Sequence, residues 1–244
     1  SGVMTWNKLK ISTLLMANII RQYNGKHIGI MLPASVGASL ITIATILAGK
    51  IPVMLNWTTG RKNLEHAAET TELDVVLTSG KFLDKLVQID FGHLEDKLVF
   101  LEDMREQITL DKKLIAAFKS RNHASTLMKE LELDGIQGKD TAVILFTSGS
   151  ESSPKGVPLS HQNILRNISG ALEAMTFKSD DVLYGFLPPF HSFGLTVTTM
   201  LPLTTGLKVA YYPNPTEGSR IATGCERWSV SLMAGTPSVI NSIL

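Results

Sequence analysis

Residues 141–156 read Thr-Ala-Val-Ile-Leu-Phe-Thr-Ser-Gly-Ser-Glu-Ser-Ser-Pro-Lys-Gly. The apolar and β-branched residues at 141–145 are typical of a buried strand. Small and hydroxyl residues follow them, and a helical pattern begins at His161. The sequence therefore predicts a loop between a strand and a helix, in which Gly149 and Gly156 allow tight turns that a side chain would block.

The composition of this loop predicts that it binds an anion. Successive backbone N–H groups and hydroxyls can point at phosphate oxygens, and Lys155 would add a mobile positive charge. A Walker A motif is excluded, because that motif has Gly before the lysine and Ser or Thr after it, whereas Pro154 and Gly156 flank Lys155. Phosphate is the expected ligand, and a solvated Ser-rich turn is the alternative.

The same stretch resembles the Thr-Ser-Gly-Ser/Thr and Pro-Lys-Gly signature of adenylate-forming enzymes, which include acyl-CoA synthetases, peptide-synthetase adenylation domains and luciferases. Glu151-Ser152 departs from the Thr-Gly of the common form. The run from Phe146 to Glu151 is similar to that of the bifunctional 2-acylglycerophosphoethanolamine acyltransferase/acyl-carrier-protein synthetases. The resemblance implies that the phosphates of ATP contact Thr147, Ser148, Gly149, Ser150, Lys155 and Gly156.

Two later segments extend the resemblance. Pro188-Pro189-Phe190-His191 would follow a strand, which places His191 at the carboxyl end of the strand, where open α/β sheets bind ligands. It is similar to the family's Pro-x-Phe-His segment, so His191 is implied to be catalytic and to border the carboxylate substrate; a structural histidine is the alternative. Gly235-Thr236-Pro237 resembles a family segment that begins a helix lining the acyl pocket, which implies that Gly235 and Thr236 contact substrate.

Composition narrows the function classes. The chain has 244 residues, of which 44% are hydrophobic, so it can bury a sizeable core. Its net charge of +1, without a basic cluster, gives no indication of a nucleic-acid surface. Cys225 is the single cysteine, which excludes an internal disulfide framework and fits a cytoplasmic location. No histidine has the spacing of a zinc site, so no metal ligand is predicted within the chain.

The order of apolar segments predicts an α/β fold with layered, mostly parallel sheets flanked by helices. Residues 28–49 carry no formal charge, but Pro33 divides them into a strand and a helix too short for a membrane span of roughly 20 residues. A subdomain seam is expected near 176–181. Helices are expected at 5–23, 34–49, 63–72, 82–89, 111–133, 161–175 and 217–228, and strands at 28–32, 51–56, 74–78, 97–101, 141–145, 182–186, 208–211 and 231–234.

The resemblance implies a two-step reaction. A fatty acid carboxylate attacks the α-phosphorus of ATP in the presence of Mg²⁺, and the acyl group of the resulting adenylate then passes to a phosphopantetheine thiol. Acyl carrier protein or CoA would supply that thiol. The bifunctional relatives further transfer the acyl group to a lysophospholipid through another domain, and the full-length protein would associate with the inner membrane.

The family's later motifs do not occur in the sequence: the Tyr-Gly-x-Thr-Glu segment with the Mg²⁺ ligand, the ribose-binding Asp and the C-terminal lid. We therefore expect residues 1–244 to be an incomplete, N-terminal part of an AMP-binding domain that does not turn over by itself. Two alternatives stay open. One is an acyl-CoA synthetase or other carboxylate:thiol ligase, and the other is a nonenzymatic nucleotide- or acyl-binding module in which Glu151 repels the phosphates.

Overall fold

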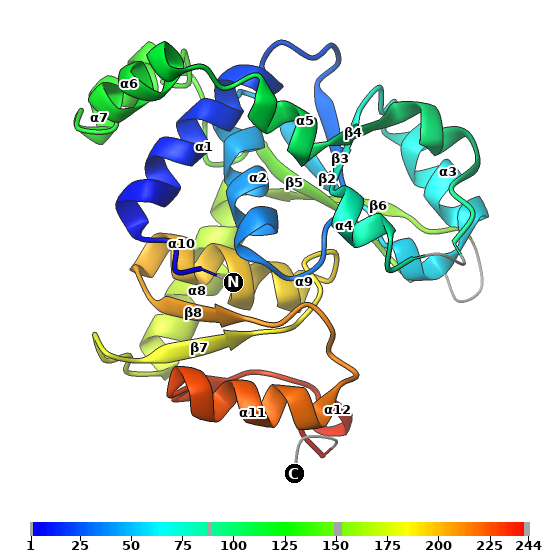
Figure 1. Ribbon diagram of the computed structural model, residues 1–244, viewed down its shortest axis with the longest axis vertical. Coiled ribbons are helices and arrows are strands. Elements are labelled where there is room, and N and C mark those ends of the chain that lie inside the picture. The colour runs from blue at the N-terminus through cyan, green and yellow to red at the C-terminus, as the bar shows by residue number, and fades with distance from the viewer. Residues whose placement is uncertain (1, 87–88, 149–152, 242–244) are drawn as a thin grey trace. The chain divides into compact units, whose positions relative to one another are not determined.

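The computed structural model (Figure 1) describes residues 2–86, 89–148 and 153–241. The chain folds into two compact units, the first formed by Ser1–Leu32 and Leu40–His161 and the second by Pro33–Ser39 and Gln162–Leu244. The seam expected near 176–181 lies inside the second unit and stays a prediction.

The first unit is built on a six-stranded sheet in the order β4-β3-β1-β2-β5-β6. Five strands are parallel, and β6 pairs antiparallel with β5 at one edge. The predicted mostly parallel sheet is confirmed. The strands are β1 (His27–Ile30), β2 (Ile51–Met54), β3 (Val76–Thr78), β4 (Leu98–Phe100), β5 (Thr141–Phe146) and β6 (Gly156–Ser160).

Continuous apolar runs form the central strands because helices cover both faces of this sheet. Every residue of β2 and β3 is buried. On one face, Leu64 of α3 (Arg61–Thr70) and Phe82 of α4 (Gly80–Leu83) pack with Val53 and Val76. In Figure 1 the strands lie between α3 and the pair formed by α1 (Trp6–Ile20) and α2 (Val36–Leu47).

Two expected helices differ from the structure. The polar stretch at 111–133 forms α6 (Leu110–Lys119) and α7 (Ala124–Glu130) rather than one helix, because His123 is extended and its side chain accepts from the Ser125 N–H. α4 ends at Leu83, short of the expected end at 89. Unpredicted elements are the 3₁₀ helices η1 (Trp57–Thr59) and η2 (Gly92–Lys97) and helix α5 (Leu101–Glu106).

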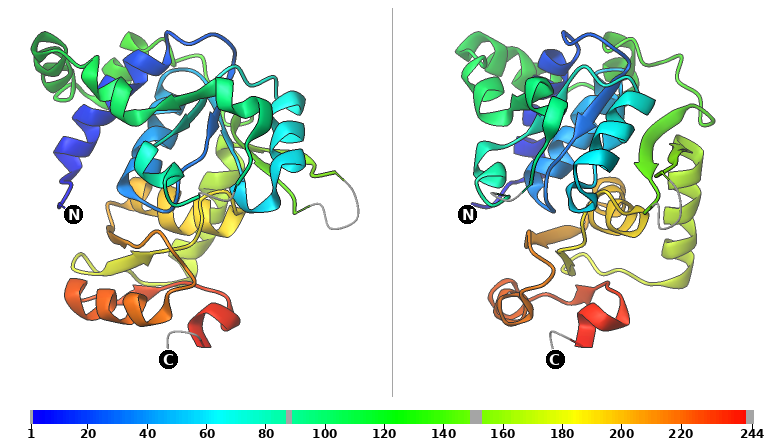
Figure 2. Two further views of the ribbon diagram at one scale, coloured as in Figure 1. Left: turned by 45° about the vertical axis from the view of Figure 1, so that its right-hand side comes forward. Right: turned by 90° about the vertical axis from the view of Figure 1, so that its right-hand side faces the viewer.

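The second unit contains a parallel three-stranded sheet in the order β8-β7-β9 (Figure 2). Its core includes Tyr184 and Phe186 from the β7 segment and Ile221 from helix α11. The predicted strands are confirmed. The elements are α8 (His161–Ala174), β7 (Val182–Gly185), α9 (Ser192–Gly194), the π-helical η3 (Leu195–Met200), α10 (Leu201–Thr205), β8 (Lys208–Tyr211), α11 (Gly218–Trp228), β9 (Leu232–Met233) and α12 (Pro237–Asn241).

The uncharged stretch at 28–49 is shared between β1 and α2, as the position of Pro33 predicts. Helix α2 has 12 residues. Across the described residues, none of the helices combines the length and apolar character that crossing a bilayer requires.

Candidate functional site

The predicted phosphate loop joins two strands rather than a strand and a helix. β5 ends at Phe146, which pairs with Gly156, the first residue of β6. Helix α8 begins only after β6, at His161, so the expected strand-loop-helix order is wrong here. Pro158 disfavours a strand at the level of sequence, but β6 lies at the edge of the sheet, where a missing N–H donor is tolerated.

Two hydrogen bonds close the base of this loop. The Thr147 N–H donates to the Lys155 carbonyl over 3.1 Å, and the Lys155 N–H donates to Thr147 Oγ1 over 3.0 Å. Thr147 Oγ1 is the acceptor in the second of these bonds, so the hydroxyl can still act as a donor to another oxygen. The side chains of Thr147, Ser148 and Lys155 are exposed, whereas Gly149 and Ser150 lie outside the described residues.

Gly156 does not form the tight turn expected of it, and its predicted phosphate contact stays a prediction. It lies in β6, and its φ is not in the left-handed region, so it supports no tight turn. A Cβ atom at this position would lie 3.3 Å from Cζ of the Phe146 ring. Gly156 therefore lets the aromatic ring of Phe146 pack against the paired strand.

His66 is a contact of the loop that sequence reasoning missed. Its Nε2 lies 3.0 Å from the carbonyl oxygen of Pro154, and Pro154 is a buried residue. To donate to that oxygen, Nε2 carries the proton. The two residues are 88 positions apart, and no local pattern indicates that α3 would reach the loop.

His191 follows the carboxyl end of β7, as predicted. Its backbone N–H donates to the Pro188 carbonyl over 3.2 Å, and its ring meets that of Phe190 edge-on at 4.6 Å between centroids. The side chain has solvent access, yet partial burial lowers the pKa of His191, which favours the neutral imidazole. This turn requires Gly194, because a Cβ there would lie 2.1 Å from the Pro188 oxygen.

Gly235 and Thr236 follow β9, and Pro237 begins α12, so the predicted turn into a helix is present. The Phe186 ring comes within 3.4 Å of the Cβ position of Gly235. Since β7 and β9 are parallel neighbours, Phe186 and Gly235 both lie where these strands end. In the second unit, His191, Gly235 and Thr236 therefore lie on segments that follow the carboxyl ends of its parallel strands. The residues of the predicted phosphate loop belong to the first unit.

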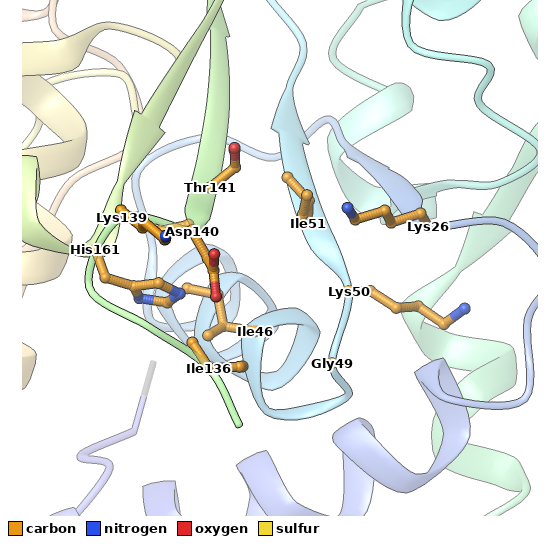
Figure 3. Close-up of a pocket in the computed structure, with 11 residues that line it drawn as sticks. Lys26, Ile46, Gly49, Lys50, Ile51, Ile136, Lys139, Asp140, Thr141 and His161 are labelled. Atoms are coloured by element: carbon orange, nitrogen blue, oxygen red, sulfur yellow. The ribbon is translucent and has the colours of Figure 1, made fainter. Parts of the chain in front are cut away.

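A cavity of about 370 Å³ in the first unit lies at the other end of its strands (Figure 3). Lys26, Lys50 and Asp140 line it just before β1, β2 and β5 begin, whereas the predicted phosphate loop follows β5. Lys50 Nζ donates to two backbone carbonyls at 2.6 Å and points away from Asp140 and His161. Burial lowers the pKa of His161, and the Asp140 charge opposes that shift. The cavity and the predicted phosphate loop therefore lie at opposite ends of β5.

The described residues contain no cluster of side chains suited to metal ligation. Within residues 2–86, 89–148 and 153–241, no group of three or more His, Cys, Asp or Glu side chains could hold a metal ion.

Comparison with known proteins shows the family. Residues 2–244 match the family described as AMP-binding enzyme. This chain belongs to the AMP-binding enzyme family. A long-chain-fatty-acid–CoA ligase of Bacillus subtilis is 26% identical over an alignment of 258 positions, which covers 97% of this chain and 45% of that protein. JamA of Moorena producens, a medium-chain-fatty-acid–[acyl-carrier-protein] ligase, is 29% identical over 121 residues, or 47% of this chain and 20% of JamA.

Solved structures of AMP-binding enzymes share this fold. The o-succinylbenzoate CoA synthetase MenE of Bacillus subtilis, in complex with its acyl-adenylate intermediate, has a TM-score of 0.77 at 17% identity, over 100% of this chain and 58% of that chain. The same enzyme with ATP and magnesium ion has a TM-score of 0.74 over 60% of its chain. The predicted fold class is therefore confirmed. This chain spans less than half the length of the Bacillus fatty acid ligase.

Proposed function

We propose that a protein containing residues 1–244 is an ATP-dependent fatty acid ligase that forms an acyl-adenylate and then a thioester. The observation that carries the proposal is the closed loop base, in which Thr147 and Lys155 are held together beside the end of β5 in a chain of the AMP-binding family. The Bacillus relative, which is similar over most of this chain, is named as a ligase of long-chain fatty acids. JamA, which is similar over about half of it, is named as a ligase of medium-chain fatty acids.

The loop side chains would stabilise the departing pyrophosphate. In the first step a carboxylate oxygen of the fatty acid bonds to the α-phosphorus, and the bond from that phosphorus to the β-phosphate bridging oxygen breaks. The Lys155 ammonium and the Thr147 hydroxyl, both exposed on the loop, would approach the β- and γ-phosphates as negative charge moves onto them. Mg²⁺ would add charge neutralisation when bound.

His191 would orient the fatty acid. A neutral imidazole can hydrogen-bond a carboxylate oxygen without neutralising the charge that makes it nucleophilic, and the lowered pKa of His191 favours that neutral form. Gly235 and Thr236 leave the same sheet edge and would line the acyl chain. Holding both reactants in place removes much of the entropic part of the barrier.

The acceptor proposed for the second step is the phosphopantetheine thiol of acyl carrier protein. The thiolate attacks the acyl carbonyl, and AMP leaves with the oxygen that bridged it to the acyl group. The loop's similarity to the bifunctional synthetases supports this choice, as well as onward transfer to 2-acylglycerophosphoethanolamine by a further domain. CoA is the alternative acceptor, because the Bacillus relative is a CoA ligase.

The test is fatty-acid-dependent exchange of labelled pyrophosphate into ATP, measured with the protein that contains residues 1–244. We expect exchange, and Lys155→Ala should lower its rate by roughly 100-fold. Lys81→Ala, which removes an exposed lysine of α4, is the matched control and should retain the rate. Residues 1–244 alone should give no exchange.

No exchange with fatty acids of any length would overturn the proposal. A panel of aryl and amino acids would then distinguish another carboxylate ligase from a nonenzymatic binding module. The acceptor is decided by comparing thioester formation on CoA and on holo acyl carrier protein, and a preference for CoA would replace the proposed acceptor.

A further inference from the structure

Helix α6 exposes large apolar side chains to solvent. The exposed fractions are 73% for Leu110, 65% for Leu114 and 72% for Phe118, and Ile115 is 53% exposed. Figure 2 shows α6 and α7 at the periphery of the first unit in both views. Scattered exposed leucines are ordinary in soluble proteins, but four on one ten-residue helix form a patch that needs a physical reason.

The apolar stripe of α6 faces away from the protein body. Leu110, Leu114 and Phe118 are four residues apart, so at about 100° per residue they lie along one side of the helix. The buried side is marked by Ala116, which is 2% exposed and packs with Leu14 of α1. A surface helix normally turns its apolar stripe toward the core, and α6 does the reverse.

Basic side chains border this stripe. Residues 110–121 contain four basic side chains and one acidic one, Asp111, which leaves a net charge of +3 in a chain whose total is +1. At about 100° per residue, Lys113 lies beyond Leu110 on one side of the four exposed apolar residues, and Lys119 and Lys112 lie beyond Ile115 on the other, toward the side of Ala116. Asp111 lies between Phe118 and Ile115 on the exposed face. Lys119 Nζ is 3.6 Å from Glu130 of α7, a partly exposed ion pair.

We propose that α6 is a docking surface for an anionic lipid bilayer. Leucine and phenylalanine side chains can enter the boundary between headgroups and acyl chains, while the net positive charge of residues 110–121 would attract lipid phosphates. Lys113 is exposed, whereas Lys112 and Lys119 would exchange their contacts with the Gln107 carbonyl and Glu130 for headgroup contacts. A second copy of this chain is the less favourable occupant, because pairing α6 with itself would bring two segments of net charge +3 together. The proposal does not depend on adenylation, since vesicle binding needs neither ATP nor a thiol.

The test is sedimentation of residues 1–244 with vesicles of phosphatidylcholine, with or without phosphatidylglycerol. We expect binding that requires phosphatidylglycerol and weakens as salt rises, because each basic group near the surface contributes about a fivefold factor in the partition coefficient. The double variant Leu114→Ser/Phe118→Ser should bind at least roughly tenfold more weakly. Lys113→Glu should lower binding by about tenfold or more, since it changes the local charge by two.

The matched control is Leu165→Ser/Leu172→Ser, which removes two leucines that are 54% and 45% exposed on α8. It should bind as the parent chain does. All four substituted positions are exposed to solvent: Leu114, Phe118, Leu165 and Leu172. Both double variants should therefore keep the circular dichroism spectrum and the urea midpoint of the parent chain.

Three results would overturn the proposal: no binding to phosphatidylglycerol vesicles, unchanged binding by the folded α6 variant, or an equal loss in the α8 control. A dimer in sedimentation velocity that the α6 variant abolishes would assign the face to a second copy instead. Vesicle binding without pyrophosphate exchange would leave this proposal standing and overturn only the proposed function.

Discussion

His66 and Pro154 join two parts of the first unit that lie 88 residues apart in the sequence. The variant His66→Ala removes one hydrogen bond from the end of the phosphate loop. This loss should lower the free energy of local opening of the loop by about 1 kcal/mol. We expect faster deuterium uptake by the backbone N–H groups of Ser153, Lys155 and Gly156, and a higher KM for ATP in the complete protein. His66→Gln, whose amide can donate to the same carbonyl, should restore both; unchanged uptake in His66→Ala would contradict the contact.

The pKa of His191 is a second property at this scale. Partial burial lowers this pKa below the ordinary value of 6.5. The folded state therefore binds fewer protons than the unfolded state between the two pKa values, so the contribution to stability is complete above pH 6.5 and is lost as pH falls through the folded-state pKa. An NMR titration of the imidazole should give a midpoint below 6.5.

Phe190→Ala is the matching variant, because Phe190 packs edge-on against the His191 ring. Removing the aromatic ring hydrates the imidazole, so the titration midpoint should move up toward 6.5. A midpoint above 6.5 in the parent chain would show that a charge partner, rather than burial, governs the group.

At the scale of elements, the turn from β7 into α9 depends on Gly194. A methyl group there would overlap the Pro188 carbonyl, whose oxygen would lie 2.1 Å from the new Cβ. We expect Gly194→Ala to lower the free energy of unfolding by about 1–3 kcal/mol. Urea unfolding followed by circular dichroism measures this change.

Gly170→Ala is the control within a helix. Gly170 lies inside α8, where an added Cβ meets nothing within 4 Å. Alanine should therefore raise the free energy of unfolding by about 0.5–1 kcal/mol through helix propensity and chain entropy. If both substitutions changed stability alike, the close approach to Pro188 would be wrong.

The sequence predicts elements well where burial dictates composition. β2 and β5 end within a few residues of their expected positions, because strands buried in a parallel sheet need unbroken apolar runs. β6 was missed because Pro158 is tolerated only through its place at the edge. The helical run from Ser192 to Thr205 was missed because β-branched residues fill 196–199, where the Thr198 hydroxyl donates to the Gly194 carbonyl over 2.6 Å and occupies a backbone acceptor.

For the molecule as a whole, the order of three motifs along the sequence is sufficient to indicate the family. The phosphate loop, the His191 segment and the Gly-Thr-Pro turn resemble segments that occur in the same order in adenylate-forming enzymes. The family match over residues 2–244 agrees with this resemblance. Contacts between distant segments could not be predicted this way. His66 beside Pro154, and Phe186 beside Gly235, arise from strand order, which local composition does not encode.

The most direct test of the central claim, that a fatty carboxylate attacks the α-phosphorus of ATP, follows oxygen from the acid. A fatty acid labelled with oxygen-18 in its carboxyl group is incubated with ATP, the thiol acceptor and the protein containing residues 1–244, and the nucleotide products are weighed by mass spectrometry. Formation of an acyl-adenylate leaves one oxygen-18 atom in AMP. Formation of ADP with the label in inorganic phosphate would mean attack at the γ-phosphorus and would contradict the account.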